Sequence, residues 1–206
     1  MKGARDGRQT RDTILVAASR AIQFRGYQAT SLDEVLRESG IGKGNFYYHF
    51  RSKEDLGYAI LDQIVASFLR ETLDPCFADR AGEPLAQIRC FLDRVLELKR
   101  AQNGAGGCPL GSLASELADV HEGFRERLAG VFSAWRACLT RALEEARRRG
   151  AVGQECQSAS VAQFLVASLV GAMLMAKLAK VVGVMEQCVI ELKRYLAGFE
   201  RRTAAA

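Results

Sequence analysis

Four types of hydrogen-bonding side chain cluster in one seven-residue segment of the sequence. Residues 43–49 read KGNFYYH. If this segment is helical, Phe46 points inward and the lysine, asparagine, tyrosine and histidine side chains stay at the surface. Such side chains supply donors and acceptors for phosphate oxygens and for the edges of bases. The segment therefore predicts contact with a nucleic acid.

The residues before this segment predict the helix that must position it. Ser31 and Glu34 have the spacing of a capping box, in which each side chain bonds to the backbone N–H of the other residue. A helix is therefore expected to begin near Leu32, and Gly40 supplies the positive-φ residue that commonly ends a helix. Two short helices joined by a tight turn are typical of a helix-turn-helix, whose second helix enters the major groove.

Residues 10–56 resemble the DNA-binding domain of the TetR family of transcriptional regulators. The matching pieces are Gly26-Tyr27, Thr30-Ser31, Gly40-Ile41, residues 43–50 and residues 52–56. Two positions depart from the family pattern, because Gly42 stands where a capping serine is frequent and Asn45 where threonine is common. The operator sequence of a relative therefore cannot be transferred to this chain.

The resemblance implies an all-α fold in two parts. Residues 1–52 are expected to form a three-helix helix-turn-helix DNA-binding domain, and residues 53–206 a larger helical domain for effector binding and dimerisation. Within the first part, the predicted DNA-binding residues are Thr30, Ser31, Lys43, Gly44, Asn45, Tyr47, Tyr48, His49 and Lys53. We expect Thr30, Tyr48, His49 and Lys53 mainly at phosphates, and Lys43, Asn45 and Tyr47 at bases.

Two other interpretations of this stretch are weaker. Residues 40–45, GIGKGN, lack the glycine and the Ser or Thr that a phosphate-binding P-loop requires at fixed positions. A helical hairpin at the surface without DNA gives no packing reason to expose two tyrosines and a histidine.

The positive charge is concentrated on the same part of the chain. Residues 1–53 contain ten Lys and Arg and five Asp and Glu, whereas residues 54–206 contain nineteen of each. This distribution favours a polyanion as the partner of the first segment. A purely architectural DNA binder would not need some 150 further residues of neutral, apolar helix.

Apolar residues at helical spacing predict helices along the whole chain. Residues 1 to about 9 are expected to form a mobile arm before a helix at 10–24, and a long helix from Ser52 to about Leu73 is expected to stop at Pro75. Further helices are expected near residues 84–102, 109–118, 123–149, 158–181 and 184–199. The last two are apolar beyond one stripe, which favours a four-helix homodimer interface over a core within one subunit.

The larger domain is expected to hold a small-molecule effector, as the family resemblance implies. The residues expected to line the site are Phe68, Phe91, Val95, Cys108, Leu113, Leu117, Trp135, Leu139 and Phe164. The same residues could fill a solid core, since aromatic residues at helical spacing are more often core than pocket. An apolar lining would favour an apolar or amphipathic effector.

The six cysteines lack the spacing of metal sites and disulfide scaffolds, so reduced thiols are expected. Cys108 immediately precedes Pro109, a residue favoured at the first position of a helix. A thiolate at such a helix N-terminus is stabilised and reactive, and the segment around it resembles one found in TetR-type regulators that sense electrophiles or oxidants. Cys90 and Cys188 are expected to be shielded in apolar surroundings. A sensing thiol and a simple helix cap both remain open for Cys108.

No feature of the sequence predicts an enzyme, a metal site or a cofactor. The chain has two histidines, no G-x-S-x-G motif and no cluster with metal-ligand spacing. The start, MKGARDGRQTR, has no apolar core, and the apolar residues 161–176 are expected to be a buried helix and not a membrane span. The expected protein is a cytoplasmic, homodimeric, effector-responsive regulator, in function a repressor that releases a palindromic operator.

Overall fold

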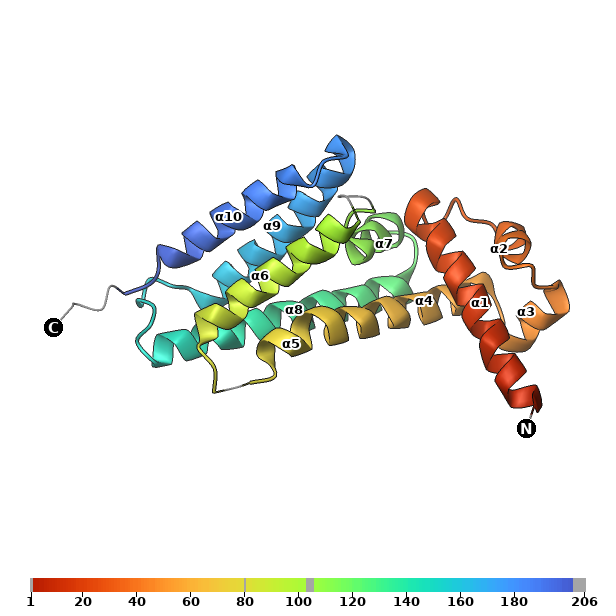
Figure 1. The fold of residues 1–206 in the computed structure, drawn as a ribbon, viewed down its shortest axis with the longest axis horizontal. Helices are drawn as coiled ribbons and strands as arrows, with labels where there is room; N and C mark the ends of the chain where they lie inside the picture. The colour runs from red at the N-terminus through yellow and green to blue at the C-terminus, as the bar shows by residue number, and fades with distance from the viewer. Residues whose placement is uncertain (1, 80, 103–105, 202–206) are drawn as a thin grey trace. The chain divides into compact units, whose positions relative to one another are not determined.

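The computed structural model describes residues 2–79, 81–102 and 106–201, and it is helical throughout (Figure 1). Apart from an isolated bridge between Val152 and Glu200, these residues contain no β-structure. The elements are α1 (Lys2–Arg25), α2 (Leu32–Ser39), α3 (Lys43–His49), α4 (Lys53–Phe68), the π-helix η1 (Leu69–Leu73), α5 (Asp74–Phe77), α6 (Pro84–Ala101), α7 (Pro109–Leu117), α8 (Glu122–Arg148), α9 (Ser158–Ala179) and α10 (Gly183–Ala197). The predicted all-α fold class is confirmed.

The first helix begins earlier than the sequence suggests. Helix α1 starts at Lys2, so residues 2 to 9, which were expected to form a mobile arm before the helix, are part of it, and Met1 lies outside the described residues. Residues 2–25 contain no proline, and nothing therefore interrupts the helical hydrogen bonds. Thr13 also donates its hydroxyl hydrogen to the carbonyl oxygen of Gln9, at 2.8 Å.

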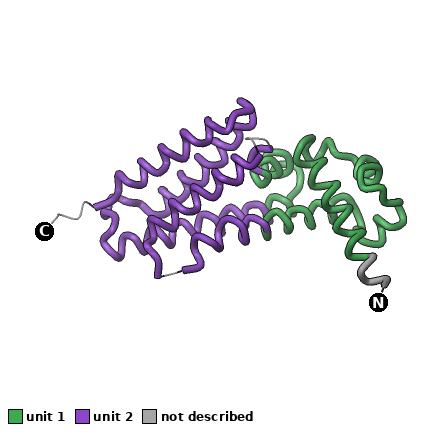
Figure 2. Tube along the Cα trace, viewed as in Figure 1, with its two compact units in different colours: residues 1–66, 109–126 green, residues 67–108, 127–206 purple. Residues whose placement is uncertain are grey.

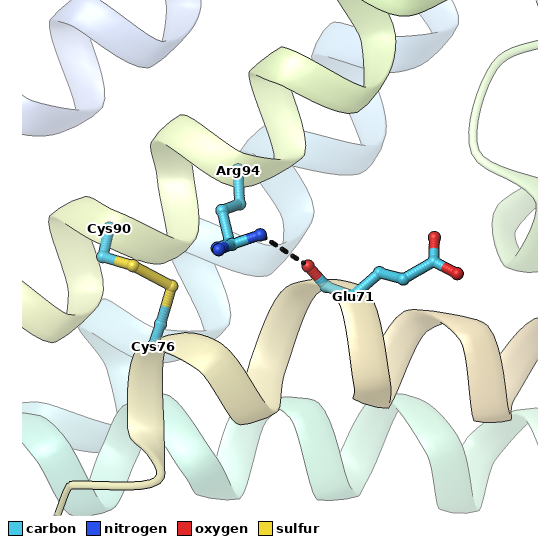
Figure 3. Close-up of a disulfide and its surroundings, with 4 residues drawn as sticks. All are labelled: Glu71, Cys76, Cys90 and Arg94. Atoms are coloured by element: carbon cyan, nitrogen blue, oxygen red, sulfur yellow. Dashed lines mark hydrogen bonds between the residues drawn. A yellow bond between two sulfur atoms is a disulfide. The ribbon is translucent and has the colours of Figure 1, made fainter.

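The prediction that Pro75 stops the long helix is wrong. Helix α4 continues through η1 into α5, and the residues at both junctions keep right-handed helical dihedrals. Proline lacks an N–H, so the carbonyl of Glu71, four residues earlier, loses its α-helical donor. The Arg94 guanidinium of α6 donates to that oxygen at 3.2 Å (Figure 3). The wider π-helical turn and this side chain together accommodate a proline inside the helix.

The chain packs into two compact units, coloured separately in Figure 2. The first comprises residues 1–66 and 109–126, and the second residues 67–108 and 127–206. The predicted boundary after residue 52 lies between α3 and α4, whereas the division by packing follows residue 66. By packing, α4 and α8 contribute to both units, and α7 belongs with the helix-turn-helix.

The core of the first unit is built from α1 to α4. Its buried members are Ile14, Leu15, Ala18, Val35, Phe46, Phe50, Leu56 and Ile60. Phe46 is fully buried, and its ring lies 5.6 Å from the ring of Phe50. Because α3 has only seven residues, this one buried side chain decides which side of the helix faces inward.

The second unit contains α6, α9, α10 and the longer part of α8. Helix α10 packs against both α9 and α6 (Figure 1). By length and composition alone, α9 is apolar enough to cross a membrane. One side of α9 is buried in the unit, as expected, while Phe164, Leu174 and Leu178 on it are exposed.

A second contact surface in the first unit joins α4 to the segment before α2 and to the start of α8. The ring of Tyr27 lies 5.2 Å from that of Phe124, and the Tyr27 hydroxyl donates to the carbonyl of Lys53 at 3.2 Å. Gly57 of α4 allows this approach. A Cβ atom at Gly57 would lie 2.5 Å from Tyr27 and 2.8 Å from Phe124.

Substituting Gly57 with alanine should therefore destabilise the protein. We expect Gly57→Ala to lower the free energy of unfolding by about 1–3 kcal/mol, because two packed rings must move. Gly130→Ala in α8 is the matched control, since no atom lies within 4 Å of its Cβ position, and it should stabilise by about 0.5–1 kcal/mol. Denaturant unfolding of both variants measures the difference. Equal effects would show that the Tyr27 and Phe124 rings are not tightly packed on Gly57.

Candidate DNA interface and effector site

Helix α3 presents most of its side chains to solvent. Lys43, Gly44 and Asn45 are exposed, and Tyr47 and Tyr48 have exposed fractions of 49% and 82%. His49 is half-buried, with its ring 4.9 Å from that of Tyr48. Both tyrosine rings are thus accessible to a ligand at this surface. The arrangement offers a lysine, an amide, two phenols and an imidazole on one short helix.

Helix α2, which precedes α3 in the chain, is capped at both ends. Ser31 is the N-cap residue, and the capping box with Glu34 is formed in both directions. The bond from the Ser31 backbone is the main cause that lowers the pKa of the Glu34 carboxyl. Gly40 has φ of 68° and ends the helix, as predicted. The N-cap residue of α3, Gly42, makes no side-chain cap bond, in line with the weaker cap inferred there.

The side chain of Thr30 lies differently from our expectation. Thr30 is buried, and its hydroxyl donates to the carbonyl of Gly26 at 2.7 Å. This hydroxyl hydrogen is already used to close the turn before α2. The geometry therefore does not support a phosphate contact through the Thr30 side chain, and Ser31 has its hydroxyl engaged in the capping box.

Lys53 lies at the first position of α4 and is half-buried. Its ammonium lies 4.6 Å from the ring centroid of Tyr27 and donates to the carbonyl of Gln28 at 3.3 Å. Burial lowers the pKa of Lys53. The lysine is thus held in one place beside the start of α2, while part of it still reaches solvent.

An unpredicted contact ties α7 to the same region. Glu116 accepts the backbone N–H of Gln28 at 3.0 Å, and the Gln28 side chain donates to the Glu116 carbonyl at 2.6 Å. Gly26 has φ of 92°, and a Cβ atom there would meet the Glu116 carboxylate at 2.6 Å. No local sequence pattern joins residues 88 positions apart, so only the packing reveals this latch between Gln28 and Glu116.

Three of the predicted effector residues form an aromatic cluster in the second unit. The ring of Trp135 lies 5.1 Å from Phe68 and 5.7 Å from Phe91. Phe132 and Phe77 extend the cluster. We call Phe68, Phe77, Phe91, Phe132 and Trp135 the aromatic cluster. Val95 and Leu139 are also buried in this unit.

Other predicted effector residues lie elsewhere. Leu113 and Leu117 are buried on α7, which belongs to the first unit. Phe164 is 47% exposed and lies 4.8 Å from the ring of Tyr195 of α10, so it faces outward and does not line an interior site.

Two buried polar side-chain atoms, one in the aromatic cluster and one in η1, have no hydrogen-bond partner among the described residues. Trp135 is 1% exposed, and among the described residues its indole nitrogen has no hydrogen-bond acceptor. The hydroxyl of Thr72, within η1, is likewise buried without a described partner. Buried polar groups are normally satisfied, and π-helical turns often occur at functional sites. Both groups are therefore candidates to bind a ligand.

Cys108 lies immediately before α7 and is buried. Two lysines surround this position. The ammonium of Lys99 donates to the carbonyl of Gly107 at 2.6 Å, and the methylene chain of Lys177 lies against Gly107. Burial lowers the pKa of Lys99, and its charge interaction with Cys108 opposes that shift. The site thus combines the N-terminal end of α7 with one neighbouring cation, the ammonium of Lys99.

The expectation that all cysteines are reduced thiols is wrong for one pair. Cys76 and Cys90 form a disulfide with a Cα–Cα distance of 5.7 Å (Figure 3). They are 14 residues apart, and the turn between α5 and α6 brings them together. Cys188 remains a thiol whose pKa is raised by burial, as predicted. The cysteine spacings of metal sites and of disulfide-rich proteins do not reveal a single pair that is brought together by the packing of two helices.

Comparison with known proteins agrees with this architecture. Residues 14–60 match the model of bacterial regulatory proteins of the tetR family, and residues 84–190 match the tetracyclin repressor-like C-terminal domain. Transcriptional regulator AcuR from Cereibacter sphaeroides is 31% identical over 86% of this chain and 80% of that protein. The repressor NemR from Escherichia coli K12 is 27% identical over 91% of this chain and 94% of its own.

Solved structures show the same fold. The crystal structure of regulatory protein TetR from Rhodobacter sphaeroides has a TM-score of 0.80 and 27% identity, over 89% of this chain and 97% of that one. The reduced form of E. coli NemR has a TM-score of 0.77 and 25% identity, over 96% of this chain and all of its own. Both family models match, and a relative is similar over most of the chain. The chain therefore belongs to the TetR family of helix-turn-helix transcriptional regulators.

Proposed function

We propose that this regulator is a homodimeric, cytoplasmic repressor that binds a palindromic operator and releases it when an effector binds the second unit. The observation that carries the proposal is α3, the second helix of the helix-turn-helix, which exposes Lys43, Asn45, Tyr47 and Tyr48 around one buried phenylalanine. These four side chains do not pack in the core. Together they are suited to contact the bases of a major groove and the phosphates beside it.

The DNA contacts divide between the helix and its surroundings. Lys43, Asn45 and Tyr47 are proposed to contact bases, whereas Tyr48, His49 and Lys53 are proposed to contact phosphates. Ser31 and Thr30 hold the turn and α2 in place through their hydrogen bonds, and Gly44 allows close approach of the backbone.

The aromatic cluster supports an effector with apolar surface and at least one hydrogen-bond acceptor. The rings offer apolar contacts, and the buried indole N–H of Trp135 needs an acceptor. Helix α4 continues from Lys53 into η1, where Thr72 lies, so one helix carries both a DNA-facing residue and the edge of the candidate site. By reciprocity, effector and operator must weaken each other's binding.

The homodimer is proposed to form through α9 and α10. Leu174, Met175, Leu178 and Ile190 have exposed fractions of 49% to 70%. Exposed apolar surface of this size on two neighbouring helices is typical of a protein–protein interface. A second copy is the partner that suits a regulator reading a two-fold symmetric site.

A second candidate function is thiol-based sensing through Cys108. Its position before α7, together with Lys99, favours a thiolate that electrophiles can modify. Helix α7 is joined to the segment before α2 by the latch between Glu116 and Gln28. Modification of Cys108 would thus act at the start of a helix whose far end holds the helix-turn-helix.

The division of DNA contacts can be tested once the protected DNA beside the gene has been mapped. We expect a palindrome with half-sites about 10 bp apart, or a multiple of it, and steep salt dependence. Asn45→Ala should cost about 1–3 kcal/mol, mainly at one base position. Lys53→Ala should weaken all sequences alike and reduce the salt slope by about one.

Fluorescence anisotropy with operator and scrambled duplexes over a range of salt concentrations measures both effects. Arg148→Ala is the control, because Arg148 is an exposed cation of the second unit. A loss in Lys53→Ala confined to one base pair would reverse the assignment, and binding of one subunit to an asymmetric site would contradict the proposed function.

The dimer interface can be tested with a charge on the exposed apolar face. Leu178 is 70% exposed on α9, so Leu178→Glu should leave the subunit folded but disfavour association. Analytical ultracentrifugation should show a monomer at micromolar concentration. Val120→Glu, at an equally exposed apolar residue of the first unit, should stay dimeric. A dimeric Leu178→Glu protein would move the interface elsewhere.

The thiol proposal predicts that Lys99 promotes the reactivity of Cys108. Replacing it in Lys99→Met removes the neighbouring cation, and alkylation of Cys108 by iodoacetamide at neutral pH should slow about tenfold. Mass spectrometry of the Cys108 peptide gives the rate of alkylation. The control is Lys193→Met, which removes a lysine that is paired with Asp93. If Cys108→Ser still releases operator at the same dose of thiol reagent, Cys108 is only a helix cap.

A further inference from the structure

The disulfide between Cys76 and Cys90 joins α5 to α6, and among the described residues a bond from the Gln87 side chain to the Asp79 carbonyl also links α6 to the segment that follows α5. Cys76 lies in α5, a helix of four residues, and Cys90 lies in the middle of α6 (Figure 3). A further link nearby is the hydrogen bond from Arg94 to the Glu71 carbonyl, about one turn away on each helix. The disulfide therefore fixes the end of the continuous run formed by α4, η1 and α5 against α6.

Each cysteine is a sequence neighbour of a ring in the aromatic cluster. Phe77 follows Cys76, Phe91 follows Cys90, and their ring centroids lie 6.1 Å apart. Phe91 in turn lies 5.7 Å from Trp135. Because protein interiors are close-packed, a change in the distance between α5 and α6 must also change the packing of the rings around Trp135.

Two observations argue against a permanent structural bond. DNA-binding regulators work where chromosomal DNA lies, and thiols there are kept reduced, so disulfides in that compartment are usually transient and redox-sensing. Cys90 is also half-buried, whereas Cys76 is buried, so Cys90 is the more accessible residue of the pair. Redox-sensing cysteines are commonly accessible residues with a second, resolving cysteine beside them, and this pair has that arrangement.

We propose that Cys76 and Cys90 form a reversible thiol–disulfide couple, oxidised by low-molecular-weight disulfides, that controls the packing of α5 and of the aromatic cluster. The couple is separate from Cys108 and does not depend on any effector. In the oxidised state α5 is held on α6 as in the structure. In the reduced state the end of the α4–η1–α5 run is free to move, and the Phe77 and Phe91 rings lose their fixed separation.

The chemistry is two consecutive exchange reactions. The Cys90 thiolate attacks one sulfur of a disulfide RSSR, and a Cys90–SR bond forms while RS⁻ leaves. The Cys76 thiol gives its proton to solvent and attacks the Cys90 sulfur, and the second RS⁻ leaves. Both RS⁻ ions take up the protons released by the protein. Two protein thiols are thus oxidised to one disulfide, and RSSR is reduced to two RSH.

Trp135 reports this couple directly because it is the only tryptophan of the chain. The full-length protein is equilibrated in buffers of reduced and oxidised glutathione at different ratios, trapped with iodoacetamide and digested. We expect the Cys76–Cys90 bond to form and to disappear within the range of ratios found in a cytoplasm. Trp135 fluorescence should change along the same curve, and the melting temperature should fall by about 5–12 °C on reduction.

Two variants separate the couple from other effects of the redox buffer. Cys76→Ser/Cys90→Ser should show no redox-dependent change in fluorescence or melting temperature. Cys188→Ser should behave as the wild type, since Cys188 is a half-buried thiol outside the pair.

Three results would overturn the proposal. The first is failure of the bond to form in oxidised glutathione, and the second is its persistence in the folded protein under excess dithiothreitol. The third is unchanged Trp135 fluorescence across complete reduction of wild type, which would show that the bond has no control over the cluster. The wild-type titration decides between these outcomes even if the double variant does not fold.

Discussion

The burial of Phe46 is the interaction on which the DNA-binding surface depends. Helix α3 has seven residues and a glycine N-cap without a side-chain bond, so the helix has little stability of its own. Phe46 anchors it in the core formed with α1, α2 and α4. Since one face is fixed in this way, helical geometry leaves Lys43, Tyr47 and Tyr48 outside. The exposure of the tyrosines is thus a consequence of one packed ring.

The long run from α4 to α5 connects the candidate DNA and effector sites by backbone alone. Lys53 begins it beside Tyr27 and Gln28, and Cys76 lies near its end. The α-helical hydrogen bonding of this run is interrupted at Pro75, which has no N–H to donate. The chain forms the π-helix η1 just before this proline, and Arg94 donates to the Glu71 carbonyl. The same π-helical turn contains Thr72, whose buried hydroxyl has no partner among the described residues.

A second connection runs through α7. The latch between Glu116 and Gln28 and the ring contact of Tyr27 with Phe124 place α7 and the start of α8 in the same compact unit as the helix-turn-helix. Cys108 stands at the other end of α7. Helices α4 and α7 thus each contact the segment between α1 and α2 at one end and lead at the other end toward a candidate site, at Thr72 or at Cys108.

The sequence by itself determined the local structure, because capping, helical periodicity and glycine at a positive φ act over a few residues. Ser31 with Glu34, Gly40, the helix starts at Pro84 and Pro109 and the family of the DNA-binding domain were all readable in this way. Only the tertiary structure decided what depends on residues distant in the chain. It buried Thr30, turned Phe164 outward, joined Cys76 to Cys90, and placed Arg94 where Pro75 leaves a carbonyl without a donor. Each of these outcomes depends on which helices pack together, and no local pattern carries that information.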